Sequence, residues 1–170
     1  MNPDLHAQFA SLLDEHRQLV IKLARTYTRS PADQEDLAQE IVFQLWRAFP
    51  AYDPARRFST WMYRIGLNVA ISWVRTEAPR MQRSVSFDMA AHDSAAHEDD
   101  AARDEGQRLL KAFMDGCDAL NRALLLLYLE EHSYAEMAEV LGISATNVAT
   151  KINRLKERLL RFAEAQRGTG

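Results

Sequence analysis

Apolar residues recur at spacings of three and four along almost the whole 170-residue chain, and no stretch shows the strict alternation of a half-buried strand. Spacings of three and four place apolar side chains on one face of an α-helix. Hydrophobic residues make up 47% of the chain and charged residues 26%, the balance of a globular rather than a disordered protein. The sequence therefore predicts an all-α fold.

The helical period is lost between residues 81 and 104, where the sequence MQRSVSFDMAAHDSAAHEDDAARD is rich in small, polar and acidic residues. Helical spacing resumes near Glu105. We therefore expect two small helical domains, residues 1–80 and residues 105–170, joined by a flexible acidic linker over residues 81–104.

Prolines and polar clusters divide the first domain into helices. One or two amphipathic helices are expected within residues 4–29, and another from about Ala32 to Phe49. Ser59 is a candidate N-cap for a further helix after the loop PAYDPARR, and we expect that helix to end near Pro79.

The net charge is −3, but the charges are separated along the chain. Residues 31–55 and 81–104 each carry about four net negative charges, and residues 56–80 and 140–170 each carry about four net positive ones. Local patches steer a charged partner more than the total charge does. The acidic total is therefore compatible with DNA binding.

Several classes of protein are excluded by the composition. The longest apolar run, Ala123 to Leu129, is far shorter than the roughly 20 residues that span a bilayer, and the first residues, MNPDLHAQ, show no secretory signal. The single cysteine, Cys117, fits a reducing cytoplasm. The histidines lack metal-ligand spacing apart from one pair in the linker, and no phosphate loop or nucleophile signature is present. We expect a cytoplasmic protein that is not an enzyme and has no catalytic residue, metal site or cofactor.

The sequence from Ser133 to Leu159 has the layout of a helix-turn-helix. Ser133 and Glu136 have the spacing of a capping box at the start of the first helix. Gly142 can adopt a turn conformation that other residues resist, and Ser144 is placed to cap the second helix.

The second helix of this motif has an apolar back and a polar front, as a helix that enters the major groove of DNA does. Arginine and asparagine can contact base edges, whereas lysine and flanking arginine hold phosphates. The alternative is an ordinary helical hairpin with a solvated cationic face, but the turn and both caps fall in register. The residues that we expect to contact DNA are Thr146, Asn147, Thr150, Lys151, Asn153, Arg154 and Arg158.

The helix expected at residues 32–49 displays an aromatic residue on its polar side. Phe43 stands there among acids and amides, which include Asp36, Gln39 and Glu40. Aromatic anchors dominate the energetics of protein interfaces, so this side suits a protein contact. The alternative is that Phe43 packs beneath a neighbouring loop.

The segment RRFSTWMYRIGLNVAISWVR, residues 56–75, places Trp61 in the middle of a polar stripe with Arg64 and Asn68. Exposed aromatic rings stack on unpaired bases, neighbouring arginines hold the backbone, and an amide can contact a base edge. The alternative is that Trp61 packs against the preceding loop, PAYDPARR. Geometry alone favours neither interpretation.

These motifs resemble a known family. The segment DLAQEIVFQLWRAFPAYDPARRFSTWMYRIGLNVAISWVR closely resembles region 2 of extracytoplasmic-function (ECF) sigma factors, and EEHSYAEMAEVLGISATNVATKINRLKERL resembles their region 4. With the order and the linker, the resemblance covers about residues 9–163. It implies a non-catalytic specificity subunit of bacterial RNA polymerase, with a region 2-like helical bundle and a region 4-like helix-turn-helix.

The resemblance implies three sets of contacts. The segment that begins DLAQE is similar to region 2.2, which docks on the clamp helices of the polymerase β′ subunit; the implied contacts are Asp36, Gln39, Glu40 and Phe43. RRFSTWMYRIGLNVA is similar to regions 2.3 and 2.4, which open and read the −10 promoter element; the implied contacts are Arg57, Phe58, Ser59, Thr60, Trp61, Arg64 and Asn68. Residues 145–158 are similar to the helix that reads the −35 element, and its implied contacts are the seven polar residues named above.

The implied partners are core RNA polymerase (the β′ clamp helices and the β flap), promoter DNA and an anti-sigma factor, with the protein on the nucleoid when in holoenzyme. The acidic linker is similar to one that passes through the polymerase channels as a nucleic-acid mimic; a solvated tether is the alternative. Ala149 departs from the family, since many members carry a basic residue there.

Two other functions fit the sequence less well. A stand-alone helix-turn-helix regulator would leave the surfaces around Phe43 and Trp61 without a purpose. An anti-sigma factor or adaptor protein that copies these folds would not need basic faces in both halves.

Overall fold

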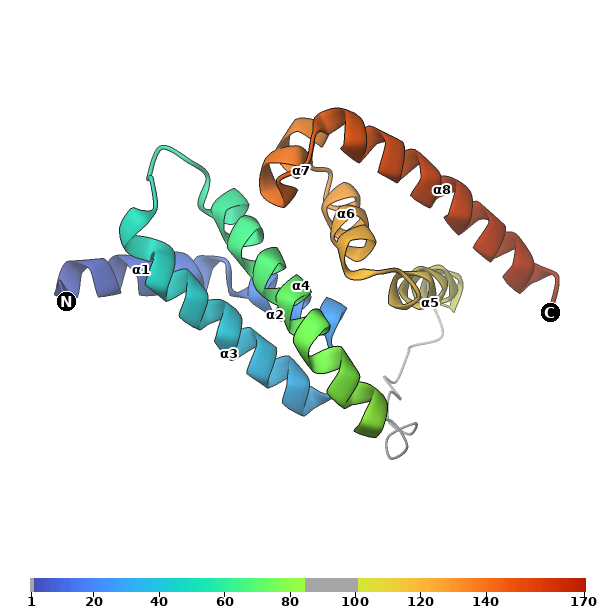
Figure 1. Ribbon diagram of the computed structural model, residues 1–170, viewed down its shortest axis with the longest axis horizontal. Helices are drawn as coiled ribbons and strands as arrows, with labels where there is room; N and C mark the ends of the chain where they lie inside the picture. Colours follow the sequence, from blue (N-terminus) through green and yellow to red (C-terminus); the bar gives the residue numbers. More distant parts are fainter. Residues whose placement is uncertain (1, 85–100) are drawn as a thin grey trace. The chain divides into compact units, whose positions relative to one another are not determined.

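The computed structural model describes residues 2–84 and 101–170, and within these ranges the chain forms eight α-helices and one 3-10 helix (Figure 1). Most of the linker predicted over residues 81–104 lies outside the described residues. The chain divides into two compact units. Residues 1–79 form most of the first, and residues 80–137 and 143–170 form the second. The all-α prediction is confirmed.

The first unit contains the helices that the sequence predicts, with the segment at 4–29 split in two. Asn2 caps the first helix and Ser30 caps the third, through side-chain oxygens that accept backbone N–H groups. The chain breaks at His16, whose ring Nδ1 lies 2.9 Å from the carbonyl oxygen of Leu12. The elements are α1 (Pro3–Glu15), α2 (Arg17–Tyr27), α3 (Pro31–Ala48), the 3-10 helix η1 (Phe49–Ala51) and α4 (Phe58–Ser84).

The core of the first unit lies among α2, α3 and α4, and Figure 1 shows α3 and α4 running beside each other. Gly66 allows α4 to approach closely, because a Cβ added there would stand 2.6 Å from Leu23 Cδ1 and 3.6 Å from Ile41 Cγ2. Leucine, isoleucine and methionine side chains fill the interior. Those with no exposed surface are Leu23, Leu37, Ile41, Leu45, Met62 and Leu67.

Helix α4 is longer at both ends than the sequence predicts. It begins at Phe58, so that Ser59 lies in its first turn and is not its N-cap, and it continues past Pro79 to Ser84. A proline removes one N–H donor and crowds the carbonyl oxygen four residues before it, which weakens a helix at that point without requiring the helix to end there. Helix α5 likewise starts at Ala101 rather than near Glu105, since its first residues are good helix formers.

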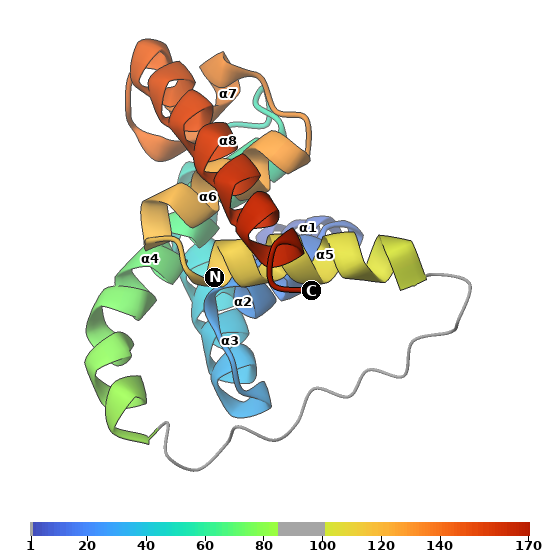
Figure 2. The same cartoon turned by 90° about the vertical axis from the view of Figure 1, so that its right-hand side faces the viewer.

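The second unit contains α5 (Ala101–Asp115), α6 (Ala119–Leu129), the start of α7 (Tyr134–Leu141) and α8 (Ala145–Arg167). In Figure 2, α8 crosses α6 and its C-terminal end reaches α5, and each pair of these three helices is in contact. Phe113 of α5 and Phe162 of α8 meet with ring centroids 5.6 Å apart. The interior is closed by the fully buried Leu124 and Leu127 of α6.

The two serine caps and the turn predicted for the helix-turn-helix are confirmed, but only one half of the capping box is present, because Glu136 Oε2 lies 3.0 Å from His132 Nδ1 and not on the N–H of Ser133. The Ser133 hydroxyl accepts a hydrogen bond from the N–H of Glu136 at 3.1 Å, and the Ser144 hydroxyl accepts one from the N–H of Asn147 at 3.0 Å. Gly142 has a φ of +69°, in the left-handed region that disfavours a side chain. Local chemistry therefore fixes the start and the turn of this motif.

A pair of glycine substitutions is expected to change stability in opposite directions. Gly142→Ala should lower the free energy of unfolding by about 1–2 kcal/mol, because alanine resists the left-handed conformation. Gly106→Ala, in the open interior of α5, should raise it by about 0.5–1 kcal/mol. Circular dichroism during unfolding measures the loss of helix in the whole chain. Fluorescence separately follows the first unit, which carries Trp46, Trp61 and Trp73. The assignment of the turn would be contradicted if Gly142→Ala were as stable as wild type and Gly142→Asn were no more stable than Gly142→Ala.

Candidate functional site

Helix α3 exposes the aromatic residue that the sequence singles out. The side chain of Phe43 is 53% exposed, so the alternative that it packs beneath a loop is not what the structure shows. The guanidinium carbon of Arg47, one turn later, stands 5.9 Å from the centroid of its ring, within cation–π range. The opposite side of the helix holds Phe43 outward because it is anchored in the core by Leu37, Ile41 and Leu45.

Carboxylates and amides surround Phe43 on the same helix. Gln39 Nε2 donates to Glu35 Oε1 at 3.5 Å, and Gln44 Nε2 donates to Glu40 Oε1 at 2.8 Å. Asp36 and Gln39 are exposed and Glu40 is half-buried. The structure thus brings together Asp36, Gln39, Glu40 and Phe43, which we call the α3 face: an apolar anchor within an acidic, hydrogen-bonding rim.

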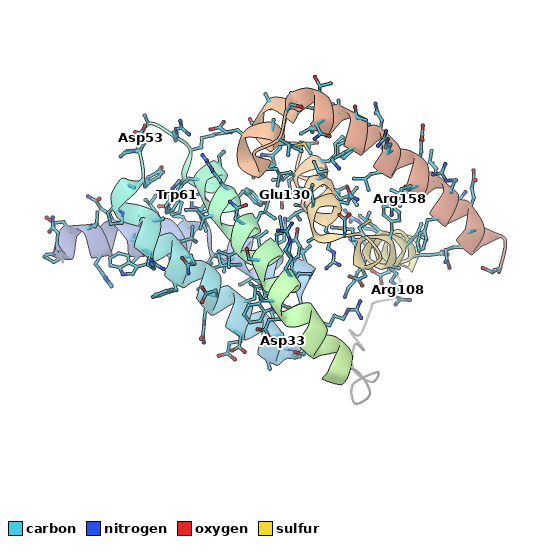
Figure 3. All side chains as sticks on the ribbon, viewed as in Figure 1. Asp33, Asp53, Trp61, Arg108, Glu130 and Arg158 are labelled. Atoms are coloured by element: carbon cyan, nitrogen blue, oxygen red, sulfur yellow. The ribbon has the colours of Figure 1, made fainter. Side chains whose placement is uncertain are left out.

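Trp61 lies one turn into α4, beside the loop that carries Asp53 (Figure 3). Its indole is half-buried, with ring centroids 5.0 Å from Tyr52, 5.3 Å from Phe58 and 6.1 Å from Phe49. The contact with Tyr52 is the loop packing that the alternative interpretation predicts. The exposed part of the ring remains available to a partner, so the two interpretations are compatible.

The other residues predicted to contact the −10 element lie on α4, except Arg57, which directly precedes it, and they differ in exposure. Arg57, Arg64 and Asn68 are exposed, and Ser59 and Thr60 are half-buried. Phe58 differs, because it is only 6% exposed and packs against Tyr52 at 5.4 Å, so the structure does not present its ring to a partner. The α4 stripe consists of the half-buried Trp61 and the exposed Arg64 and Asn68.

The loop before α4 contains two residues that the sequence analysis did not select, Tyr52 and Asp53. The Tyr52 hydroxyl donates to the carbonyl oxygen of Arg56 at 2.7 Å, and Asp53 Oδ1 accepts from the N–H of Ala55 at 3.0 Å. The N–H of Arg56 also donates to the Asp53 carbonyl at 3.0 Å. An aspartate before a proline is a turn signal that could have pointed to this ordered loop.

Helix α8 has a polar side that begins in its first turn. Its back is fixed by Val148, Ile152 and Leu155, none more than 1% exposed. Six of the seven predicted DNA contacts are exposed, and the seventh, Lys151, is half-buried. The α8 face consists of Thr146, Asn147, Thr150, Lys151, Asn153 and Arg154.

Two residues of this helix have local contacts of their own. The Thr150 hydroxyl donates to the carbonyl oxygen of Thr146 at 3.0 Å, which leaves it as an acceptor toward a partner. The guanidinium carbon of Arg158 lies 5.8 Å from the centroid of the Phe113 ring, so Arg158 stands at the border between the α8 face and α5.

The requirements of a metal site and of a membrane-spanning helix can be compared with the described residues. They hold no group of three or more histidine, cysteine or acidic side chains that could bind a metal. None of the described helices has both the length and the apolar character needed to cross a membrane. Burial raises the pKa of the Cys117 thiol, whose sulfur donates to the Phe113 carbonyl at 3.3 Å. A higher pKa makes that thiol a poorer nucleophile at neutral pH.

Two family models match the chain. Residues 12–80 match sigma-70 region 2, and residues 119–159 match sigma-70, region 4. The matches contain the α3 face, the α4 stripe and the α8 face, and together they span more than half of the chain.

Two curated proteins that are similar to this chain are also named as sigma factors. The ECF RNA polymerase sigma factor SigW of Bacillus subtilis is 27% identical over 165 residues, with 89% of this chain and 86% of SigW covered. The RNA polymerase sigma factor CnrH of Cupriavidus metallidurans is 25% identical over 166 residues, with 92% of this chain and 87% of CnrH covered.

Solved structures agree with these relatives. CnrH in complex with the cytosolic domain of CnrY superposes with a TM-score of 0.66 at 26% identity, covering 94% of this chain and 90% of that one. The sigma factor RpoE in complex with the anti-sigma factor NepR from Bartonella quintana gives a TM-score of 0.69 at 17% identity, covering 92% and 97%. The second likeness concerns the fold alone.

Proposed function

This chain belongs to the sigma-70 family and is an ECF sigma factor, a non-enzymatic, promoter-recognising subunit of RNA polymerase, and we propose that its exposed surfaces divide that work. The α3 face docks on the clamp helices of the β′ subunit. Phe43 fills an apolar pocket there, while Asp36, Gln39 and Glu40 meet basic and polar groups at the rim.

The α4 stripe opens the −10 element and holds the melted strand. The exposed part of Trp61 stacks on an unpaired base, Arg57 and Arg64 hold phosphates, and Asn68 contacts a base edge. The hydroxyl groups of Ser59 and Thr60, in the first turn of α4, donate hydrogen bonds to the DNA backbone. Phe58 supports Trp61 from within the core.

The single observation that carries this proposal is the exposure pattern of α4. A tryptophan with part of its ring exposed stands in line with exposed arginine and asparagine side chains, while Met62, Tyr63 and Leu67 are buried on the other side. A tryptophan that only packed against the loop would not need exposed arginine and asparagine side chains beside it. A platform for an unpaired base needs a free ring surface and cations to hold the strand.

The α8 face reads the −35 element in the major groove. Thr150, Asn153 and Arg154 contact bases from the exposed side of the helix, and Lys151 and Arg158 hold phosphates at its edges. Thr146 and Asn147, in the first turn, meet the backbone or a base edge. Residues 105–170 act as the −35 domain, which also meets the β flap, and residues 1–80 act as the −10 domain.

Regulation comes from a separate protein. The solved relatives CnrH and RpoE are bound to CnrY and to the anti-sigma factor NepR. We propose that an anti-sigma factor covers the α3 face of this chain in the cytoplasm and releases it to polymerase on the nucleoid. Because inhibitor and core would share one surface, Phe43→Ala should weaken both interactions. The linker, residues 81–104, tethers the two domains.

Arg154→Ala is expected to relax sequence discrimination at one −35 position by about tenfold, since one good base contact contributes roughly 1–3 kcal/mol. Its matched control is Lys151→Ala. Loss of a phosphate contact should weaken binding to every sequence alike and lower the slope of log affinity against log salt by about one.

The measurement is a holoenzyme binding titration on a promoter and on its single-base −35 variants, at several salt concentrations. Equal losses on all variants for Arg154→Ala, with an unchanged base preference, would contradict its role as a base reader.

A further inference from the structure

Tyr52 connects the loop before α4 to the ring of Trp61. Its ring lies 5.0 Å from Trp61, 5.4 Å from Phe58 and 5.7 Å from Phe49 between centroids. Tyr52 and Phe49 stack at an interplanar angle of 16°. Tyr52 therefore covers one part of the indole, next to the parts that Phe49 and Phe58 contact, and limits which part of the ring is left exposed.

The hydroxyl of Tyr52 fixes a second element. It donates to the carbonyl oxygen of Arg56 at 2.7 Å, and so holds the peptide that leads into Arg57 and the start of α4. The N–H of Tyr52 donates to the Phe49 carbonyl at 2.9 Å, which anchors the other side of the residue. One side chain thus sets both the tryptophan surface and the backbone that carries the neighbouring arginines.

We propose that Tyr52 is a positioning residue of the −10 surface, which holds Trp61 and the Arg56–Arg57 backbone in the arrangement that receives an unpaired base. The inference rests on the proposed function of the α4 stripe. Tyr52 acts through Trp61 and Arg57. It stabilises the receptive arrangement before DNA binds, so that less ordering has to take place when the strand melts.

The hydroxyl of Tyr52 can be tested separately from its ring. Tyr52→Phe keeps the ring contacts and removes only the hydrogen bond to Arg56. That bond is exposed to solvent, so its loss should leave the melting temperature almost unchanged. An effect of Tyr52→Phe on promoter opening then reports positioning rather than folding. Tyr128→Phe, which removes a hydroxyl from α6 beside Lys156, is the matched control.

The experiment uses holoenzyme with the full chain and a promoter that carries 2-aminopurine in the −10 element. The rise in fluorescence gives the rate of base unstacking. Tyr52→Phe should open duplex promoter about threefold to tenfold more slowly than wild type, the range for one lost hydrogen bond. At saturating holoenzyme, its transcription from a template already unpaired at the −10 element should return to the wild-type level. Tyr128→Phe should open duplex at the wild-type rate.

Two results would overturn the inference. One is a wild-type opening rate for Tyr52→Phe; the other is an equal loss on duplex and unpaired templates together with a lower melting temperature, which would indicate a structural role. Trp61→Ala is measured in parallel. If Trp61→Ala slows opening and Tyr52→Phe does not, only the positioning role fails. If neither variant slows opening, the proposed function of the α4 stripe fails as well.

Discussion

Trp61→Ala is expected to slow the opening of a duplex promoter by about tenfold to hundredfold while leaving binding to core polymerase intact. Stacking on an aromatic side chain contributes about 1–3 kcal/mol per base, and a strand that has lost this platform re-pairs more readily. Trp61 lies on α4, whereas the docking residues lie on α3, so the two functions should separate. The measurement is the fluorescence of 2-aminopurine in the −10 element as holoenzyme opens the duplex.

Trp61 also packs on Tyr52, Phe58 and Phe49, so its removal is expected to lower the melting temperature of the first unit as well. Two controls separate folding from base capture. Trp61→Phe keeps an aromatic platform and should restore most of the opening rate. A template with an unpaired −10 element should restore transcription by Trp61→Ala. If the loss is the same on duplex and unpaired templates, Trp61 serves only to pack the loop.

Phe43→Ala is expected to weaken binding to core polymerase by about 30-fold or more, as truncation of a central aromatic anchor costs about 2 kcal/mol or more. The ring is 53% exposed in the free chain, so little packing within the protein is lost with it. The melting temperature should therefore stay near that of wild type. Fluorescence anisotropy of labelled protein, titrated with core polymerase, gives the affinity directly.

The controls for Phe43 use the same assay. Phe43→Leu keeps a large apolar side chain and should recover part of the affinity. Gln18→Ala, at an exposed position of α2 outside the α3 face, should bind core as wild type does. Wild-type affinity in Phe43→Ala would contradict docking through this face, whatever happens at the promoter.

Local features of the fold could be predicted from the sequence because their causes lie within a few residues. Ser144 and Asn147, three residues apart, form the cap of α8, and Gly142 alone supplies the turn before it. The exposure of Phe43 follows from the three-and-four spacing of the apolar residues on α3. Each of these needs only the helix that contains it.

Features that depend on packing between segments could not be predicted in the same way. Phe58 belongs to a polar segment by sequence, yet it is buried because Phe49 and Tyr52 fold back onto it. The same rings bury one side of Trp61, so its half-exposure depends on the folded arrangement of the loop and not on α4 alone. Pro79 suggested a helix end, but a proline near one end of a long helix does not outweigh the turns on either side.

The central claim, that this chain directs polymerase to promoters, is tested most directly by run-off transcription. Bacterial core polymerase, the full-length chain and a genomic promoter library are combined, with Phe43→Ala and Trp61→Ala alongside. Promoter-specific transcripts should require both core and this chain, fall with Phe43→Ala, and for Trp61→Ala return on templates with an unpaired −10 element. Absence of core binding, together with tight binding of the chain alone to promoter duplex, would contradict the account and indicate a stand-alone regulator.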